Sequence, residues 1–320
     1  MTLDKKEESM LSSQVKPLLE VKHLSQFFKI KKNSYVKAVN DVSFNIYPGE
    51  TYGLVGESGS GKSTTGRAII RLYDPTEGEI YFDGRKITGP LSKEDTRFLR
   101  LNMQMIFQDP MASLNPRQRV MDIIGAGLDN FNLYKSEKER EEKIIDALLK
   151  VGLNAEHANR FPHQFSGGQR QRIGIARALV LNPKLLIADE AISALDVSIQ
   201  AQVVTLLKEL QERTNVAILF IAHDLSMVKY ISDRIGVIHL GYLLETGTSE
   251  EIFANPIHPY TRSLLSAVPT PNPLLEKKRK AFHYDYETSG LNYEQAKLQT
   301  VAGSHQVRAS DEELKLWLSS

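Results

Sequence analysis

The sequence has 320 residues, 41% of them hydrophobic, which is enough for one large domain with an appendage or for two modest domains. Its charge is balanced, with 40 Lys and Arg against 39 Asp and Glu, so electrostatics gives no argument for a nucleic-acid partner. Since there is no cysteine, disulfides, thiolate zinc sites, iron–sulfur clusters and cysteine nucleophiles are all excluded.

The N-terminal part of the chain is predicted to begin with a disordered segment, residues 1–16, because it is polar throughout. A Lys-rich stretch over 29–37 is expected to be a hairpin loop, and Pro and Gly in residues 47–50 to reverse the chain. Strands are predicted over residues 18–28, 38–46 and 51–55, with a helix over 62–72 after a Gly-rich loop.

Strands and helices alternate through the middle of the chain. Ser136 and Glu139 have the spacing of a capping box, so a helix should begin there, and Gly152 should end it. Further helices are predicted over 167–181 and 196–213, and buried strands over 185–188 and 216–222. This alternation predicts an α/β core with a largely parallel sheet.

The composition changes after Pro269, where prolines and a basic run precede a tail rich in Tyr, Gln and Asn. We therefore assign the main domain to residues 17–268 and an extension to 269–320. The basic run, 277–280, is interpreted as a solvated linker, with contact to anionic lipid headgroups as the alternative. The longest apolar runs are too short to span a bilayer and no secretory signal is visible, so we expect a soluble, cytoplasmic chain that docks on any membrane partner.

The Gly-rich loop matches the pattern G-x-x-x-x-G-K-[ST], which binds nucleotide phosphates. Glycines let backbone N–H groups converge on the β-phosphate, and the following helix presents its positive N-terminus. Lys62 can reach the β- and γ-phosphates, while the Ser63 hydroxyl can ligate Mg²⁺. The predicted nucleotide-binding residues of the loop are Gly56, Glu57, Ser58, Gly59, Ser60, Gly61, Lys62, Ser63 and Thr64.

An apolar strand ends in two carboxylates, Asp189 and Glu190. Alone, this arrangement is more often a solvated strand end, because burying charge is costly without compensation. Together with a phosphate-binding loop, it predicts that Asp189 holds Mg²⁺ and that Glu190 polarises the attacking water as general base.

Residues 165–169, Phe-Ser-Gly-Gly-Gln, resemble the LSGGQ signature of ATP-binding-cassette ATPases, with Phe in place of Leu. Gln108 in IFQDP, the run Ser-Ala-Leu-Asp that ends at Asp196, and His223 after an apolar strand stand in that family's order. The resemblance covers roughly residues 18–260. It implies an α/β P-loop NTPase fold with a RecA-like core, an antiparallel β subdomain, a helical signature subdomain at about 109–165 and a C-terminal extension.

The resemblance also implies roles that local sequence cannot give. Such ATPases are head-to-tail dimers that sandwich ATP between the loop of one subunit and the signature of the other. Ser166, Gly167, Gly168 and Gln169 would then contact the γ-phosphate bound to a second subunit, as suits the N-terminus of a helix. The remaining implied roles belong to Gln108 as a sensor of Mg²⁺ or water, His223 as a γ-phosphate ligand, and Asp196 as a link between the two sites.

The adenine base should stack on an aromatic residue near the first strand. Phe28 aligns best with the family by spacing, while Phe27 and Tyr35 remain alternatives. The sequence departs from the family at Ala191, where Pro usually follows the acidic pair. This removes a constraint on φ, but we expect hydrolysis to be retained because both carboxylates are present.

Residues 255–269 resemble the subfamily that serves oligopeptide and dipeptide importers, and nickel or sugar importers in some members. This implies as partners a second ATPase subunit, two transmembrane permease subunits and an extracellular substrate-binding protein. The chain would be peripheral, on the cytoplasmic side of the cell membrane. The cysteine cluster of many members is absent, so no iron–sulfur cluster is expected.

A soluble cassette ATPase acting on nucleic acid is the alternative from another class. Repair members carry zinc cysteines or long coiled coils between loop and signature, whereas Gly56 and Ser166 are only 110 positions apart here (166 − 56). Translation members carry two cassettes in one chain. Since this chain has one cassette, an importer of oligopeptides is the leading interpretation.

Overall fold

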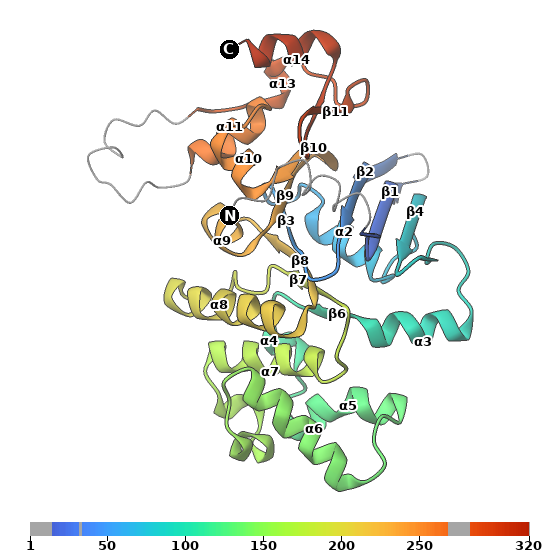
Figure 1. Ribbon diagram of the computed structural model, residues 1–320, viewed down its shortest axis with the longest axis vertical. Helices are drawn as coiled ribbons and strands as arrows, with labels where there is room; N and C mark the ends of the chain where they lie inside the picture. The colour runs from blue at the N-terminus through green and yellow to red at the C-terminus, as the bar shows by residue number, and fades with distance from the viewer. Residues whose placement is uncertain (1–14, 32–33, 268–281, 320) are drawn as a thin grey trace, which may run out of the picture.

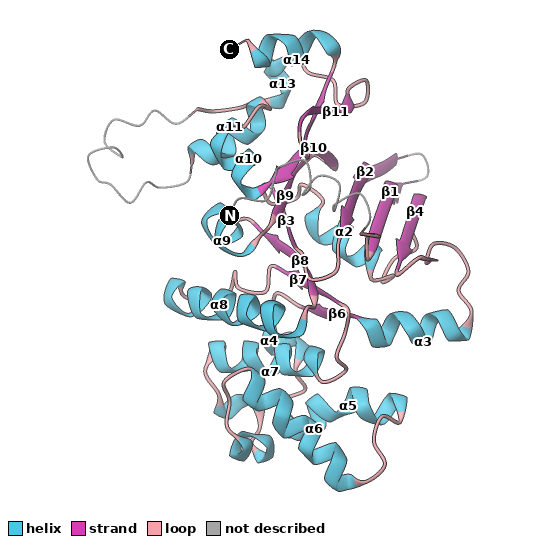
Figure 2. Cartoon of the chain, in the orientation of Figure 1, coloured by secondary structure: helices cyan, strands magenta, loops and turns pink. Residues whose placement is uncertain are grey.

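A computed structural model describes residues 15–31, 34–267 and 282–319, which form two sheets and the helices around them (Figures 1 and 2). The strands are β1 (Leu19–Lys31), β2 (Ser34–Ile46), β3 (Thr51–Val55), β4 (Glu77–Phe82), β5 (Arg85–Lys86), β6 (Met103–Ile106), β7 (Leu185–Asp189), β8 (Ala217–Ala222), β9 (Arg234–His239), β10 (Tyr242–Thr248), β11 (Lys297–Ala302) and β12 (His305–Ala309). The helices are α2 (Lys62–Ile69), α3 (Lys93–Asn102), α4 (Pro110–Ser113), α5 (Val120–Phe131), α6 (Glu137–Lys150), α7 (Gly167–Leu179), α8 (Val197–Thr214), α9 (Leu225–Ile231), α10 (Ser249–Ala254), α11 (Pro259–Ser266), α13 (Tyr286–Ser289) and α14 (Asp311–Leu318), with short 3-10 helices at Ala155–Asn159 and Pro162–Gln164.

The larger sheet has the strand order β11-β12-β10-β9-β3-β8-β7-β6, and its centre is parallel. Strand β3 pairs in parallel with β8 and β9, β7 with β8, and β6 with β7. Every residue of β3, β7 and β8 is buried, which explains why these strands are continuous apolar runs rather than alternating ones. The predicted parallel α/β core is thus confirmed, as is the antiparallel β subdomain, whose strand order is β2-β1-β4-β5.

The predicted hairpin loop over 29–37 is wrong in extent. Strand β1 continues to Lys31 and β2 begins at Ser34, with Lys29 opposite Tyr35. Lys29, Lys31 and Lys37 are exposed, so their side chains stay in water while the backbone pairs. The polar side chains therefore led to a loop prediction where β1 in fact ends and β2 begins.

Two predicted helices end earlier than expected. Helix α2 ends at Ile69 instead of 72, and the chain passes through Arg71 at a φ of 64°. Helix α7 ends at Leu179 instead of 181, before Asn182 at a φ of 49°. The left-handed conformation at these residues breaks the helical path. Arg71 gives no sign of it in sequence, whereas Asn182 followed by Pro183 is a helix-stop signal, and the predicted boundary still overran the end of α7. The segments 1–14 and 277–280, predicted to be disordered and a linker, lie outside the described residues.

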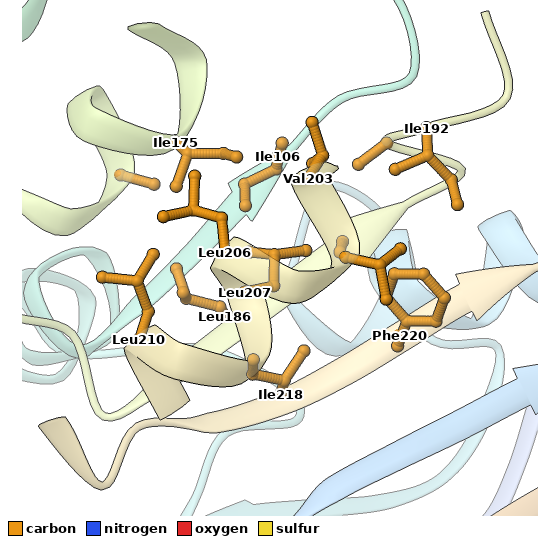
Figure 3. Close-up of a cluster of buried hydrophobic side chains, with 14 of the residues drawn as sticks. Ile106, Ile175, Leu186, Ile192, Val203, Leu206, Leu207, Leu210, Ile218 and Phe220 are labelled. Atoms are coloured by element: carbon orange, nitrogen blue, oxygen red, sulfur yellow. The ribbon is translucent and has the colours of Figure 1, made fainter. Parts of the chain in front are cut away.

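Helix α8 covers one face of the parallel sheet with the apolar stripe expected from its sequence (Figure 3). Leu207 on α8 is fully buried in one cluster with Leu186 of β7 and Ile218 of β8. Asp196 caps the helix by accepting a hydrogen bond from the Ile199 N–H. The stripe fixes α8 on the sheet and thereby holds the chain that follows β7.

The segment 109–165 contains α4, α5, α6 and the two 3-10 helices, and it lies with α7 at the opposite end of the molecule from α14 (Figure 1). Helix α6 begins as predicted, because Ser136 accepts a hydrogen bond from the Glu139 N–H. Among the helices of the described ranges, none combines the length and apolarity needed to cross a bilayer.

The C-terminal segment adds two strands to the larger sheet. Strand β12 pairs with β10, and β11 pairs with β12. The buried Arg308 guanidinium donates to the carbonyl oxygens of Leu243, Tyr293 and Ala296 and to Asp41 on β2. The extension is therefore built into the fold; its predicted boundary at 268 stays a prediction, because residues 268–281 are outside the described ranges.

Replacing Leu207 by Ala should lower the free energy of unfolding by about 2–5 kcal/mol, since it removes a buried side chain and leaves a cavity against the sheet. Urea unfolding followed by circular dichroism measures this. Leu149→Ala is the matched control, because Leu149 is a helical leucine with 57% of its surface exposed. It should cost less than about 0.5 kcal/mol, and equal losses in the two variants would contradict the assigned core.

Candidate active site

The Gly-rich loop connects β3 to α2 at the carboxyl edge of the parallel strands. At Gly61, which caps α2, φ is 105° and a Cβ atom would lie 2.2 Å from the Ala38 carbonyl oxygen. At Gly56, a Cβ would lie 2.1 Å from the Ile238 carbonyl oxygen. The loop passes so close to neighbouring backbone that only glycine fits at these two positions.

Lys62 opens helix α2 and points back along the loop. Its Nζ donates to the carbonyl oxygens of Gly56 at 2.8 Å and Glu57 at 2.7 Å. Burial lowers the pKa of Lys62, while the nearby Glu190, Asp189 and Glu57 carboxylates act in the opposite direction. The ammonium group is thus held inside the loop, where a phosphate oxygen would meet it.

The acidic pair stands at the carboxyl end of β7, beside the loop. Asp189 is buried, its Oδ2 lies 3.3 Å from Arg67 Nη2 of α2, and its Oδ1 has no hydrogen-bond partner within the described ranges. Glu190 adopts a left-handed φ of 47°, and its N–H donates to the Ile221 carbonyl oxygen on β8. A strained residue held by its neighbours is common at active sites.

A pocket of about 540 Å³ lies between the start of the loop and the acidic pair. It is lined by Gly56, Glu57, Ser58, Gln108, Glu190, Ser193, Ala194, His223 and Leu264. Gln108 Nε2 donates to Ser193 Oγ at 3.3 Å, and Ser193 Oγ donates to the Glu190 carbonyl oxygen at 3.0 Å. The structure therefore brings together all three predicted catalytic side chains, those of Glu190, His223 and Gln108.

The signature residues Ser166, Gly167, Gly168 and Gln169 do not line this pocket. Ser166 caps α7 by accepting from the Gln169 N–H, and the Gln169 side chain accepts from the Ser166 N–H in return. Gly168 is buried, and a Cβ there would lie 2.5 Å from the Ile199 side chain of α8. Ser166 and Gly167 are exposed, so the N-terminus of α7 faces solvent.

The other predicted residues outside the pocket lining are Asp196, Phe28, Asp189 and residues 59–64 of the loop. Asp196 is exposed, and hydrogen bonds from the Ser198 hydroxyl and the Ile199 N–H lower its pKa. Phe28 is half-buried on β1 and contacts Tyr73 edge-on, with ring centroids 5.4 Å apart. The structure gives Asp196 a capping role and leaves the adenine contact of Phe28 a prediction.

Three contacts of this site were missed from sequence. Arg67 pairs with Asp189, Ser193 links Gln108 to Glu190, and the Tyr260 hydroxyl on α11 accepts a hydrogen bond from the Glu57 N–H at 3.0 Å. Arg67 follows Ser63 by four positions on α2, so the two lie on one face of the helix, which offered a weak signal for it. Nothing local in the sequence points from Tyr260 to a loop 203 positions earlier.

The residues present fit a nucleotide with Mg²⁺. Gly56 lines the pocket without a side chain, and Asp189 Oδ1, which is buried and has no hydrogen-bond partner among the described residues, is a ligand of the kind that Mg²⁺ prefers. Ser63 is half-buried in the first turn of α2. The Gly-rich loop, Asp189 and Glu190 thus lie at one edge of the sheet.

Comparison with known proteins extends this picture. A family model described as ABC transporter matches residues 39–193, and one described as oligopeptide/dipeptide transporter, C-terminal region, matches 244–287. The oligopeptide transport ATP-binding protein OppF of Bacillus subtilis is 57% identical, covering 93% of this chain and 98% of its own. The dipeptide transport ATP-binding protein DppF of Lactococcus lactis is 53% identical, covering 94% of this chain and 97% of its own.

Solved structures of similar fold include cassettes from transporters. The cbiO1 protein of Clostridium perfringens, part of the transporter complex cbiONQ, has a TM-score of 0.66 and 28% identity, covering 75% of this chain and 91% of its own. A dimeric ATP-binding cassette in a post-hydrolysis state, bound to ADP and phosphate, has a TM-score of 0.65 and 31% identity, covering 72% of this chain and 98% of its own.

Gly61→Ala should lower the free energy of unfolding by about 1–2 kcal/mol from its left-handed φ alone, and its methyl group would displace the loop from Ala38. We expect ATP binding, measured with a fluorescent analogue, to be weakened by at least about tenfold. The matched control is Gly174→Ala on α7, where a Cβ has no heavy atom within 4 Å. That variant should bind ATP normally, and normal binding by both would contradict the assigned loop geometry.

The buried His258 caps α11, where its Nδ1 accepts from the Tyr260 N–H, and burial lowers its pKa to about 3. The unfolded chain takes up a proton at this imidazole near pH 6.5, whereas the folded chain does not until about pH 3. The neutral imidazole of His258 therefore makes its full contribution to the free energy of unfolding above pH 6.5. That contribution is lost as the pH falls below 6.5, by at most about 1.4 kcal/mol per pH unit. His258→Asn keeps an accepting atom that does not titrate, so its unfolding free energy should fall less steeply between pH 7 and 5. Parallel curves for the two proteins would contradict this assignment.

Proposed function

Since this chain belongs to the ATP-binding-cassette family, among the ATP-binding proteins of oligopeptide and dipeptide transporters, we propose that it hydrolyses ATP at the pocket between the loop and Glu190 to drive peptide import. The observation that carries the chemistry is the convergence of that loop with Gln108, Glu190 and His223 around one pocket. The observation that favours peptides as cargo is the match of residues 244–287 to the oligopeptide/dipeptide region.

In the proposed reaction, loop N–H groups and Lys62 bind the β- and γ-phosphates of ATP. Glu190 accepts a proton from water, whose oxygen attacks the γ-phosphorus while the bond to the β–γ bridging oxygen breaks, giving ADP and phosphate. His223, which lines the pocket, would donate to the γ-phosphate. Mg²⁺, held by Ser63, Asp189 and Gln108, would neutralise charge on the phosphate oxygens.

Gln108 has a second proposed role, because its amide reaches the Glu190 backbone through Ser193. The chain on either side of Gln108 connects β6 to the helical segment that contains α5 and α6. A change of contact at Gln108 would therefore reach both the general base and the helices. This supports its assignment as a sensor of the nucleotide state.

One chain supplies half of each proposed site. Ser166 and Gly167 are exposed at the N-terminus of α7, whose first N–H groups have no partner within the helix and suit an anion. We propose that Ser166, Gly167, Gly168 and Gln169 close over ATP on a second ATPase subunit. Asp196 would lie near the junction of the two, and Phe28 would stack on adenine.

The proposed place of work is the cytoplasmic face of the cell membrane, beneath two permease subunits fed by an extracellular binding protein. A groove of about 1,120 Å³ runs from Arg67 and Gln108 to Ile123 and Leu181 on the helical side, with Phe107 exposed at it. We assign this groove to the cytoplasmic helices of the permeases. An occupant there would contact Gln108 directly, which would couple transport to hydrolysis.

Lys62→Ala and Glu190→Gln should both abolish peptide uptake, but for different reasons. The first removes the cation that binds phosphate and should weaken ATP binding, whereas the second keeps binding but removes the base. We therefore expect Glu190→Gln to retain ATP in a closed assembly with its partner subunit. Uptake of labelled peptides by the co-purified transporter, together with ATP retention after gel filtration, measures both effects.

Glu212→Gln on α8 is the matched control for the second variant, because Glu212 is an exposed carboxylate away from the pocket. It should turn over ATP as the wild type does. Unchanged turnover in Glu190→Gln would refute the assigned base. A transporter that takes up no peptide, but does move metal ions or sugars, would refute the cargo and leave the ATPase assignment standing.

A further inference from the structure

Tyr260, in the C-terminal part of the chain, makes a direct hydrogen bond to the phosphate-binding loop. Tyr260, on α11, has 2% of its surface exposed, and its hydroxyl oxygen accepts the Glu57 N–H hydrogen bond. Glu57 follows the first glycine of the loop, and its carbonyl oxygen is one of the acceptors of Lys62 Nζ. The Tyr260 hydroxyl therefore fixes the peptide plane next to the atoms that orient the phosphate-binding lysine.

The Tyr260 ring is held by an imidazole. The His239 ring at the end of β9 stacks on it, with centroids 4.1 Å apart and an angle of 23° between the planes. Burial lowers the pKa of His239 to about 4, so the stacked imidazole is neutral at physiological pH. Burial also raises the pKa of the Tyr260 hydroxyl, which stays protonated and keeps the oxygen a neutral acceptor.

The extension supplies the next contacts in the chain. His239 Nδ1 lies 3.0 Å from the Tyr293 hydroxyl, which in turn lies 2.8 Å from the Tyr284 hydroxyl. Tyr284 also contacts the Tyr260 ring edge-on, with centroids 5.8 Å apart. Tyr293 is 2% exposed. A continuous series of contacts thus runs from the extension through His239 and Tyr260 to Glu57.

The backbone of α11 is fixed from the same side. The buried Glu245 carboxylate of β10 accepts from the N–H groups of Ile257 and His258, just before the helix begins. His305 of β12 lies 2.7 Å from the same carboxylate through its Nε2. Because Glu245 belongs to β10 and its partner His305 to β12, the start of α11 is tied to two strands of the larger sheet and has little freedom to move relative to it.

We propose that Tyr260 is a positioning residue for the phosphate-binding loop, and that residues 282–319 set ATP affinity by holding Tyr260 in place. This inference rests on the proposed ATPase function, which it deepens. Tyr260 is buried and acts through the Glu57 peptide, so it affects the orientation of the loop and of Lys62. A loop with its N–H held in advance binds phosphate without first having to be ordered.

The test is Tyr260→Phe in the full-length chain, which removes one oxygen and leaves the Glu57 N–H without its acceptor. The net value of such a hydrogen bond corresponds to a rise of about 3- to 10-fold in the Kd for ATP. In the assembled transporter, the KM for ATP should rise by a similar factor while kcat at saturating ATP changes less than about twofold. Hydrogen–deuterium exchange at the loop amides should quicken.

Tyr286→Phe is the matched control, since Tyr286 packs against the rings of His239 and Tyr293 in the same cluster. It should leave ATP affinity unchanged. Tyr293→Phe removes the bond to His239 and should raise the Kd in the same direction but less. The double variant of Tyr260 and Tyr293 should show less than the sum of the two effects, because both act on one series of contacts.

Wild-type affinity in Tyr260→Phe, or an equal loss in Tyr286→Phe, would overturn the inference and reduce the cluster to packing. Lys62→Ala separates this from a failure of the proposed function. If Lys62→Ala loses ATP while Tyr260→Phe does not, only the positioning role of Tyr260 fails. If Lys62→Ala binds ATP as the wild type does, the assigned nucleotide site fails and the inference falls with it.

Discussion

Strand β3 lies hydrogen-bonded in parallel between β8 and β9, and β7 joins on the far side of β8. Because these strands are parallel, their carboxyl ends lie at one edge of the sheet, where the backbone hydrogen bonds between neighbouring strands end. The Gly-rich loop, the acidic pair and His223 each follow one of these ends. Their meeting around one pocket is thus a consequence of strand direction, and the apolar stripe of α8 keeps that edge in place by burying the sheet beneath it.

Much of this arrangement could be read from sequence because it depends on local patterns. Continuous apolar runs identified β7 and β8, the Ser136 cap identified α6, and the glycine pattern placed a loop between a strand and a helix. The lysines at the end of β1 and the start of β2 were misread as part of a loop, because strand pairing depends on the backbone, which side-chain polarity does not report. The end of α2 at Ile69 was missed because Arg71 does not signal a left-handed backbone, whereas the end of α7 at Leu179 was signalled by Asn182 and Pro183 and was overrun.

What sequence could not supply was contact between distant segments. The hydrogen bond from Gln108 to Ser193 joins residues 85 positions apart, and the one from Glu57 to Tyr260 joins residues 203 positions apart. No periodicity connects such pairs. The start of helix α7, by contrast, is explained by local contacts. Ser166 and Gln169 form hydrogen bonds with each other, and Gly168 packs against Ile199. Each of these residues therefore has a reason to be there within the chain, independent of any phosphate.

The pairing of β10 with β12 joins Glu245 to Val307, 62 positions later (307 − 245). While the ribosome is still adding those residues, the outer backbone edge of β10 has no strand beside it, although the parallel centre is already complete. Such an edge is a template for pairing with another chain. The Glu245 carboxylate, which is buried in the finished fold, likewise has no His305 partner until that residue has been synthesised. Newly made molecules therefore pass through an interval in which the nucleotide loop can form while its last support is still being synthesised.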